Sequence, residues 1–224
     1  LVAPPGRAIV AFDMEQLEAR SIAVQSGDPF LCQIFADGLD IHHEFGVLVF
    51  PEMTAIKAAD PKGFKGNEQY NMYRDLTKRF EYGAIYGGSD ATVHKAVSAD
   101  APHITLKMTS QAIVKMKSRI SHVFAWQQRL LAKTSQPPYT LWSYLLGRRR
   151  VFPMGKPPAT DVANNPNQFA GADIMDIGYS RLLPRLEKYK GSTFLMLNQH
   201  DADYFECDEG DVPSLARDIK ESFT

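Results

Sequence analysis

Residues 194–207 have the sequence FLMLNQHDADYFEC, in which two strand-like runs flank a short polar segment. The runs 194–199 and 204–207 predict two β-strands, and residues 200–203 predict the hairpin turn that joins them. Asp201 and Asp203 would then lie at the tip of this hairpin. Because Asp is common in turns for conformational reasons alone, these carboxylates become informative only beside a second feature.

The second feature is an acidic residue at the end of a predicted N-terminal strand. Residues 8–12 (AIVAF) form an unbroken apolar run typical of a buried strand, and Asp13 follows directly. Since residues 15–24 are rich in helix formers, Asp13 could simply cap that helix. If the strand instead pairs with the hairpin, Asp13 and Asp201 meet at one end of a sheet. Two such carboxylates can bridge two magnesium ions about 4 Å apart.

A third feature is a helix, predicted over 69–87, that carries cations and aromatic rings. Arg74, Lys78, Tyr82 and Tyr86 follow one another at a spacing of four. They form a stripe about 18 Å long on one side of the helix, which is the length of an extended nucleoside triphosphate. An ordinary amphipathic helix is the alternative interpretation. Glycines beside the rings would let a flat ligand or another backbone come close, at Gly83, Gly87 and Gly88.

Together these motifs resemble those of family A DNA polymerases, the bacterial DNA polymerase I type. Residues 13–20 resemble motif A, the pattern from Arg74 through Lys78 to Tyr82-Gly83 resembles motif B, and His200-Asp201 in a hairpin resembles motif C. Their order and spacing agree with the family, and the resemblance extends over about residues 8–222.

The resemblance implies an α+β fold, in which a polymerase palm (an antiparallel sheet with helices) carries an inserted helical fingers subdomain. The palm would comprise residues 1–36 with motif A and residues 156–224 with motif C. Residues 37–155 would form the fingers. Compared with complete family members, this chain would lack the thumb and exonuclease domains.

The resemblance also implies residue roles. Asp13 and Asp201 would hold two Mg²⁺ ions, with Mn²⁺ as a substitute, and Lys78 would protonate the leaving pyrophosphate. Residues near motifs A and B would contact the incoming nucleotide: Gln16, Glu18, His42, Arg74, Lys78 and Tyr82. Others would contact the primer–template duplex, where minor-groove acceptors are nearly the same for all base pairs: Tyr86, Arg148, Asn164, Gln168 and His200.

Two of these residues bear on substrate choice. Glu18 would crowd the sugar 2′ position and so favour deoxynucleotides. Tyr82 stands where Phe is commoner in the family, and in the family a Tyr here accompanies easier acceptance of dideoxynucleotides.

The implied function is template-directed DNA polymerisation, the addition of deoxynucleotides to a primer 3′ end by two-metal nucleotidyl transfer during DNA replication. The expected partners are primer–template DNA, dNTPs and a second polypeptide that carries the thumb and the rest of the polymerase. Charge favours such a partner, because 25 Lys+Arg against 26 Asp+Glu give a net charge of −1, and DNA affinity rests mainly on phosphate neutralisation.

Two alternatives remain open at this stage. A single-subunit RNA polymerase has a similar helix, although Glu18 argues against it. A catalytically inactive architectural subunit is the other alternative, because Ala202 stands where the family usually has Glu after the motif C Asp. In that case Asp203 could replace the Glu through a water, or two carboxylates alone could bind the metals.

Further expectations concern the remaining segments. The pattern predicts one long helix over 109–135, a loop over 51–67 and a C-terminal helix over 211–223 with a buried apolar stripe. Basic residues could contact template phosphates or could form a solvated helix face: Lys115, Lys117, Arg119 and 148–150. The two cysteines, Cys32 and Cys207, suggest neither a metal site nor a disulfide framework, so we expect a cytoplasmic, reducing location without membrane spans.

Overall fold

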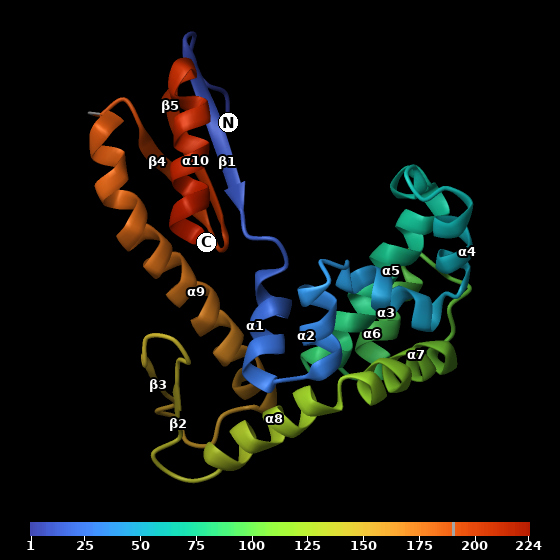
Figure 1. Cartoon of the computed structure of the whole chain (residues 1–224). Coiled ribbons are helices and arrows are strands. Elements are labelled where there is room, and N and C mark those ends of the chain that lie inside the picture. The colour runs from blue at the N-terminus through green and yellow to red at the C-terminus, as the bar shows by residue number, and fades with distance from the viewer. Residues whose placement is uncertain (190) are drawn as a thin grey trace. The chain divides into compact units, whose positions relative to one another are not determined.

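Helices and antiparallel strands build the chain in the computed structural model, which describes residues 1–189 and 191–224 (Figure 1). The elements follow one another as β1 (Arg7–Asp13), α1 (Leu17–Ser26), α2 (Pro29–Ala36), α3 (Ile41–Val49), α4 (Glu52–Ala59), η1 (Phe64–Gly66), α5 (Glu68–Ile85), α6 (Asp90–Ser98), α7 (Leu106–Arg119), α8 (Ser121–Lys133), β2 (Thr140–Trp142), β3 (Arg149–Val151), α9 (Ala159–Leu186), η2 (Glu187–Tyr189), β4 (Phe194–Gln199), β5 (Ala202–Asp208), η3 (Glu209–Asp211) and α10 (Val212–Phe223). This content confirms the predicted α+β class.

The described residues divide into two compact units. The sheet unit comprises residues 1–21, 142–150 and 165–224, and the helical unit comprises residues 22–141 and 151–164. The first division therefore falls at 21/22, whereas the sequence places the end of the first palm segment at residue 36. Among the described residues, no helix combines the length and the apolar character that crossing a bilayer requires.

Three antiparallel strands form the main sheet, in the order β1-β5-β4. β1 pairs with β5 along its whole length, and its last residue, Asp13, lies opposite Ala202. β4 pairs with the other edge of β5 through a register shift between Leu195 and Leu197. The predicted N-terminal strand and C-terminal hairpin are therefore confirmed, and they belong to one sheet.

One face of this sheet packs on α9 and α10. Alternate side chains of a strand point to the same face, and Phe12 of β1 and Phe205 of β5 are among those that face the helices. Phe12 contacts Phe223 of α10, with ring centroids 4.7 Å apart, and α10 runs beside β1 in Figure 1. The core beneath the sheet also contains Leu182, Tyr189, Cys207, Leu215 and Ile219. The apolar stripe predicted for the C-terminal helix thus belongs to this core.

The hairpin turn is shorter than the sequence predicts. β5 begins at Ala202, so His200 and Asp201 make the turn, and His200 takes a φ of 60°. Asp203 pairs with Phe12 inside the strand ladder and is fully buried. The expectation that Asp203 lies at the tip was wrong, because pairing with β1 continues beyond the point where the polar sequence suggests a turn.

In the helical unit, α5 packs against α3, α4, α6 and α7. Its N-terminus is capped by Asn67, whose side chain accepts a 2.9 Å hydrogen bond from the Tyr70 amide, and Glu68 in the first turn suits the helix dipole. Large buried side chains fill the space between these helices, among them Phe45, Met53, Tyr70, Leu76, Phe80, Ile113 and Met116.

The long helix predicted over 109–135 is in fact two helices, α7 and α8. They are separated at Ile120, which has φ −113° and ψ 47° and a fully buried side chain. At the start of α8, the His122 amide donates to Oδ2 of Asp28 at 3.2 Å. A distant carboxylate thus satisfies an amide that the break frees, which periodicity alone does not reveal.

Residues 51–67 were predicted as a loop and contain α4 and η1 instead. Met53 of α4 is completely buried, and the ring of Phe64 in η1 meets Tyr70 edge-on at 4.9 Å. Burial of these apolar side chains against neighbouring helices stabilises both elements, and α4 itself contains neither Pro nor Gly.

Candidate functional site

The sheet unit brings Asp13 and Asp201 to the same end of the strand ladder. Asp13 is the last residue of β1, and the next amide, Met14 N, donates to the carbonyl of Asp201 at 3.1 Å. The Asp13 side chain is exposed and that of Asp201 is half-buried. The two carboxylates therefore stand on adjoining, hydrogen-bonded strand ends.

The chain leaves this strand end through a turn at Gln16. Gln16 has a φ of 55°, a conformation that is costly for a residue with a Cβ. Its side-chain Oε1 is buried and has no hydrogen-bond partner among the described residues, so an acceptor is available there. Glu18, in the first turn of α1, is exposed.

Asp203 points away from the exposed side of the sheet. Its Oδ1 accepts hydrogen bonds from the Tyr179 hydroxyl at 2.7 Å and from Asn198 Nδ2 at 2.9 Å. Burial, and then the hydrogen bond to Asp203, raise the pKa of Tyr179 well above its usual range, so the phenol remains a donor. Asp203 therefore faces the helix-covered core, and the alternative in which it replaces the missing Glu after Asp201 is not supported.

A divalent ion at this strand end would have few protein ligands. Among the described residues, no group of three or more His, Cys, Asp or Glu side chains is arranged to hold a metal. Mg²⁺ is usually bound by one or two carboxylates plus substrate phosphates and waters. The exposed Asp13 and half-buried Asp201 fit that mode of binding, and they do not form an all-protein cage.

Three of the residues predicted to contact the duplex lie in the hairpin turn and on α9. His200 is exposed in the hairpin turn, and Gln168 is exposed on α9. Asn164 is half-buried on the same helix, and its Oδ1 is without a hydrogen-bond partner among the described residues.

Arg148 precedes β3 and bonds to α9. Its Nε donates to Oδ1 of the fully buried Asp173 at 2.6 Å, and a terminal nitrogen donates to Asp176 at 3.1 Å. Asp173 also accepts the Leu146 amide at 3.0 Å. In this structure Arg148 therefore fixes the segment between β2 and β3 to α9, while its side chain remains 41% exposed.

The predicted cationic and aromatic stripe lies on α5 in the helical unit. Arg74, Lys78 and Tyr82 are helical, and Tyr86 is the residue that ends the helix. The Tyr82 and Tyr86 rings are stacked, with centroids 5.9 Å apart and planes 12° apart, and Tyr82 is 47% exposed. Lys78 lies 3.4 Å from Asp75, an exposed pair that contributes little to stability.

Arg74 and His42 are both held by carboxylates. Arg74 Nε donates to Asp40 Oδ2 at 2.8 Å. Burial by itself would raise the pKa of Asp40, but the hydrogen bond and charge of Arg74 outweigh it and lower the pKa. The buried His42 places Nδ1 2.8 Å from Oε2 of Glu81, which is itself buried. Since the pair occupies Nδ1, Nε2 is the nitrogen of His42 that remains for another partner.

The glycines after Tyr82 serve the packing of helices. A Cβ on Gly83 would collide with the Val93 side chain of α6, and Gly88 approaches the Gly83 backbone. Gly87 adopts a φ of +75°. A side chain of α6 therefore comes close at Gly83, and the expected approach of another backbone occurs at Gly88.

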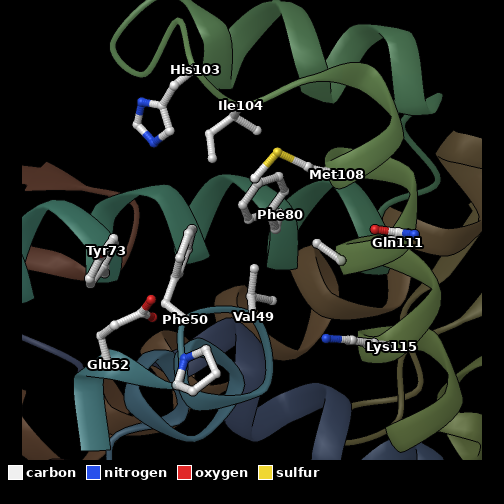
Figure 2. Close-up of a pocket in the computed structure, with 12 residues that line it drawn as sticks. Val49, Phe50, Glu52, Tyr73, Phe80, His103, Ile104, Met108, Gln111 and Lys115 are labelled. Atoms are coloured by element: carbon white, nitrogen blue, oxygen red, sulfur yellow. The ribbon is translucent and has the colours of Figure 1, made fainter. Parts of the chain in front are cut away.

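A cavity of about 340 Å³ lies in the helical unit beside α5, as Figure 2 shows. Tyr73 and Phe80 of α5 line it, and its described lining includes neither Arg74, Lys78 nor Tyr82. The cavity is therefore separate from the predicted nucleotide-binding stripe. Its other walls come from α3, α4 and α7 and their connections: Val49, Phe50, Pro51, Glu52, His103, Ile104, Met108, Gln111, Ala112 and Lys115.

Sequence reasoning missed Tyr179 and Glu81, and it placed Asp203 at the hairpin tip instead of in the core. Asp203 carried a usable signal, because it precedes Phe205 and Cys207 at a spacing of two and so shares their inward face. Glu81 and Tyr179 carried none, since their partners are distant in the sequence.

The chain is similar to known proteins over nearly its whole length. The family described as DNA polymerase family A matches residues 1–224. The thermostable DNA polymerase I of Thermus aquaticus is 27% identical over 228 residues, which cover 98% of this chain and 25% of the relative. DNA polymerase I of Chloroflexus aurantiacus is also 27% identical, over 98% of this chain and 22% of the relative. The chain thus spans about a quarter of the length of these curated relatives.

A solved structure gives the same result for the fold. The chain is similar to the POL domain of Pol1 from M. smegmatis, solved as a complex with DNA primer-template and dNTP, with a TM-score of 0.78 and 20% identity. The match covers 99% of this chain and 37% of that one. With a family match over its whole length and this likeness in fold, the chain belongs to DNA polymerase family A.

Proposed function

We propose that this chain is the catalytic portion of a template-directed DNA polymerase, which extends a primer 3′ end with deoxynucleotides by two-metal nucleotidyl transfer. The sheet unit would act as the palm and the helical unit as the fingers. The observation that carries the proposal is the meeting of Asp13 and Asp201 at one strand end, joined by the Met14–Asp201 hydrogen bond.

In the proposed reaction, the primer 3′ oxygen attacks the α-phosphorus of the incoming dNTP. The new P–O bond forms while the bond from the α-phosphorus to the bridging oxygen breaks, and pyrophosphate leaves. Asp13 and Asp201 would hold Mg²⁺, or Mn²⁺ in its place. Bound there, the metal would supply Lewis-acid activation of the 3′ hydroxyl, whose proton leaves to solvent, and would neutralise the charge of the phosphates.

Side chains of α5 and α3 would receive the nucleotide. Arg74, Lys78 and His42 would contact the triphosphate, and Lys78 would donate a proton to the leaving pyrophosphate. The half-exposed ring of Tyr82 offers a surface on which base and sugar can stack. Glu18 would exclude a 2′ hydroxyl from the sugar, and Gln16 would contact the incoming nucleotide.

The duplex would be held by residues that test base-pair geometry rather than sequence. Gln168, Asn164 and His200 carry donors suited to minor-groove acceptors. Tyr86 would lie at the templating position, and the exposed part of Arg148 would contact phosphate.

The proposal also includes a partner that contributes to DNA binding. With a net charge of −1, these 224 residues can neutralise few phosphates without help, so we propose that a partner supplies part of the DNA affinity.

Substitution of the two carboxylates tests the proposal. Asp13→Asn and Asp201→Asn should each lower primer extension by at least about a hundredfold, because an amide binds Mg²⁺ poorly and charge neutralisation is among the larger catalytic effects. The measurement is single-nucleotide extension of a labelled primer by the protein with its partner. Asp208→Asn is the matched control, since Asp208 is an exposed carboxylate in β5 that pairs with Arg7. Undiminished extension by Asp13→Asn or Asp201→Asn would refute the two-metal assignment.

A further inference from the structure

Three polar side chains meet beneath the β4–β5 hairpin. The Tyr179 hydroxyl of α9 donates to Asp203 Oδ1 at 2.7 Å, and Asn198 Nδ2 of β4 lies 2.9 Å from both that oxygen and the Tyr179 hydroxyl. Asp203 has no solvent exposure, and its Oδ2 has no hydrogen-bond partner among the described residues. We call these three residues the hairpin triad.

Packing alone does not explain the presence of a carboxylate at position 203. Asp203 shares its face of β5 with Phe205 and Cys207, which are buried in the apolar core. Burial of a carboxylate in such a place is unfavourable unless hydrogen bonds compensate, and one oxygen here remains unsatisfied. An apolar side chain would avoid that penalty, so a contribution to stability does not explain this residue.

Two residues of the hairpin triad flank the turn that contains Asp201. Asn198 lies three residues before Asp201, on β4, and Asp203 lies two residues after it, on β5. Tyr179 bonds to both strands at once, so the two sides of the turn are tied to one point on α9.

That point on α9 is itself fixed by packing. The Tyr179 ring meets the Phe223 ring edge-on, with centroids 5.9 Å apart, and the neighbouring Gly178 lies directly against Phe223. Phe223 in turn packs on Phe12 of β1. Since β1 ends in Asp13, the triad and this aromatic contact hold both acidic strand ends against the same pair of helices.

We propose that Tyr179, Asn198 and Asp203 are positioning residues that hold the Asp201 turn in register with Asp13 for metal binding. This inference rests on the proposed function, because it assigns the triad a role through Asp201. Ala202, which follows Asp201, has no polar side-chain group, and the side-chain hydrogen bonds of the triad hold the turn from the core side of the sheet.

The test compares two tyrosines of the same core. Tyr179→Phe removes a hydroxyl that donates to a buried Asp at 2.7 Å beneath the hairpin. Tyr189→Phe removes a hydroxyl that donates to another buried Asp, Asp218, at the same 2.7 Å. Asn198→Ala is a second variant, because Asn198 is exposed and its loss leaves no cavity in the core.

The first readout is hydrogen exchange at the Met14 amide, which bonds to the Asp201 carbonyl. We expect exchange to accelerate about three- to tenfold in Tyr179→Phe and Asn198→Ala, as loss of one hydrogen bond implies, and to stay unchanged in Tyr189→Phe. The second readout is Mn²⁺ binding by electron paramagnetic resonance, in which the same two variants should bind more weakly by a similar factor.

The third readout is the Mg²⁺ concentration that gives half-maximal primer extension. It should rise severalfold in Tyr179→Phe and Asn198→Ala, with recovery of most of the rate at high Mg²⁺, and should not change in Tyr189→Phe. A purely structural role would alter thermal stability in both tyrosine variants and leave the Mg²⁺ requirement unchanged. Normal Met14 exchange or a normal Mg²⁺ requirement in both triad variants would overturn the inference. Absence of extension by the unsubstituted protein would refute the proposed function instead, while exchange and Mn²⁺ binding would still decide the role of the triad.

Discussion

Two adjacent histidines of α3 show how much a side chain's role depends on its neighbours. His42 faces the carboxylate of Glu81, whereas His43 lies 3.0 Å from the Tyr70 hydroxyl. Both rings are buried. His43 has a neutral partner in Tyr70, so burial disfavours its protonated form.

A pH dependence of stability follows for His43. Burial, and next the charge of Lys57, lower the pKa of His43, while Glu44 and Asp40 act in the opposite direction. The unfolded chain therefore binds this proton more readily, with a pKa of about 6.5. The contribution of His43 to stability is complete above that pH and is lost as the pH falls through the lowered folded-state pKa, with a slope of at most about 1.4 kcal/mol per pH unit.

Urea unfolding at pH 7.5 and pH 5.5 measures this effect. The decrease in the free energy of unfolding between the two pH values should be smaller in His43→Gln than in the unsubstituted chain. His200→Gln, at the exposed hairpin turn, controls for the substitution itself. An identical decrease in all three proteins would contradict the prediction.

Tyr82 supports a prediction on substrate choice. If the ring lies beside the sugar of the incoming nucleotide, its hydroxyl can substitute for the missing 3′ hydroxyl of a dideoxynucleotide. Tyr82→Phe should therefore disfavour dideoxynucleotides relative to dNTPs by at least severalfold, since one hydrogen bond contributes about 1 kcal/mol. The ratio of the two kcat/KM values measures the effect.

Tyr73→Phe is the control for that experiment. Tyr73 is on the same helix, but its ring stacks on Phe50 with centroids 4.5 Å apart, at the separate cavity. Equal discrimination by Tyr82→Phe and the unsubstituted protein would exclude the proposed place of the Tyr82 hydroxyl.

At the scale of the elements, α9 joins several features of the sheet unit. It supplies Asp173 to Arg148, Tyr179 to the hairpin triad and Leu182 to the core. Its glycines differ in environment. A Cβ on Gly178 would overlap the Phe223 ring, whereas a Cβ on Gly171 would lie 3.6 Å from Leu17, an ordinary contact.

Alanine at these two positions should therefore have opposite effects. Gly178→Ala should lower the free energy of unfolding by about 1–3 kcal/mol, because the tightly packed Phe223 must shift. Gly171→Ala should be neutral or stabilising by up to about 1 kcal/mol through helix propensity. Chemical denaturation of both variants checks this, and equal effects would show that Phe223 relaxes freely.

At the scale of the whole molecule, charge is the informative property. The basic residues of α7 that could have formed a DNA-binding patch also make intramolecular contacts. Lys115 Nζ donates to the Leu48 carbonyl at 3.3 Å, and Arg119 lies 4.5 Å above the Phe30 ring. Both side chains remain exposed beside these contacts, as expected for a solvated helix face.

The 224-residue chain alone should consequently bind a primer–template weakly. We expect a dissociation constant of about 1 µM or weaker at physiological salt, in the range of non-specific binding. Fluorescence anisotropy across a series of KCl concentrations measures this, with circular dichroism to verify the helical fold. Nanomolar binding at physiological salt would show that the chain needs no partner for affinity.

The sequence by itself determined the strands at both ends, the position of α5 and the acidic residues at the strand ends. These features follow from patterns of a few neighbouring residues: an apolar run before Asp13, a hairpin around Asp201 and a spacing of four on α5. Local periodicity is sufficient there because hydrogen bonding and burial repeat with the period of the element.

Only the tertiary structure decided where Asp203 points, why the helix breaks at Ile120 and which carboxylate holds His42. Each of these depends on a partner far away in the sequence: Tyr179, Asp28 and Glu81. A buried polar group is stable only where the fold delivers a matching group, and that match arises from packing between elements, not from the pattern within one.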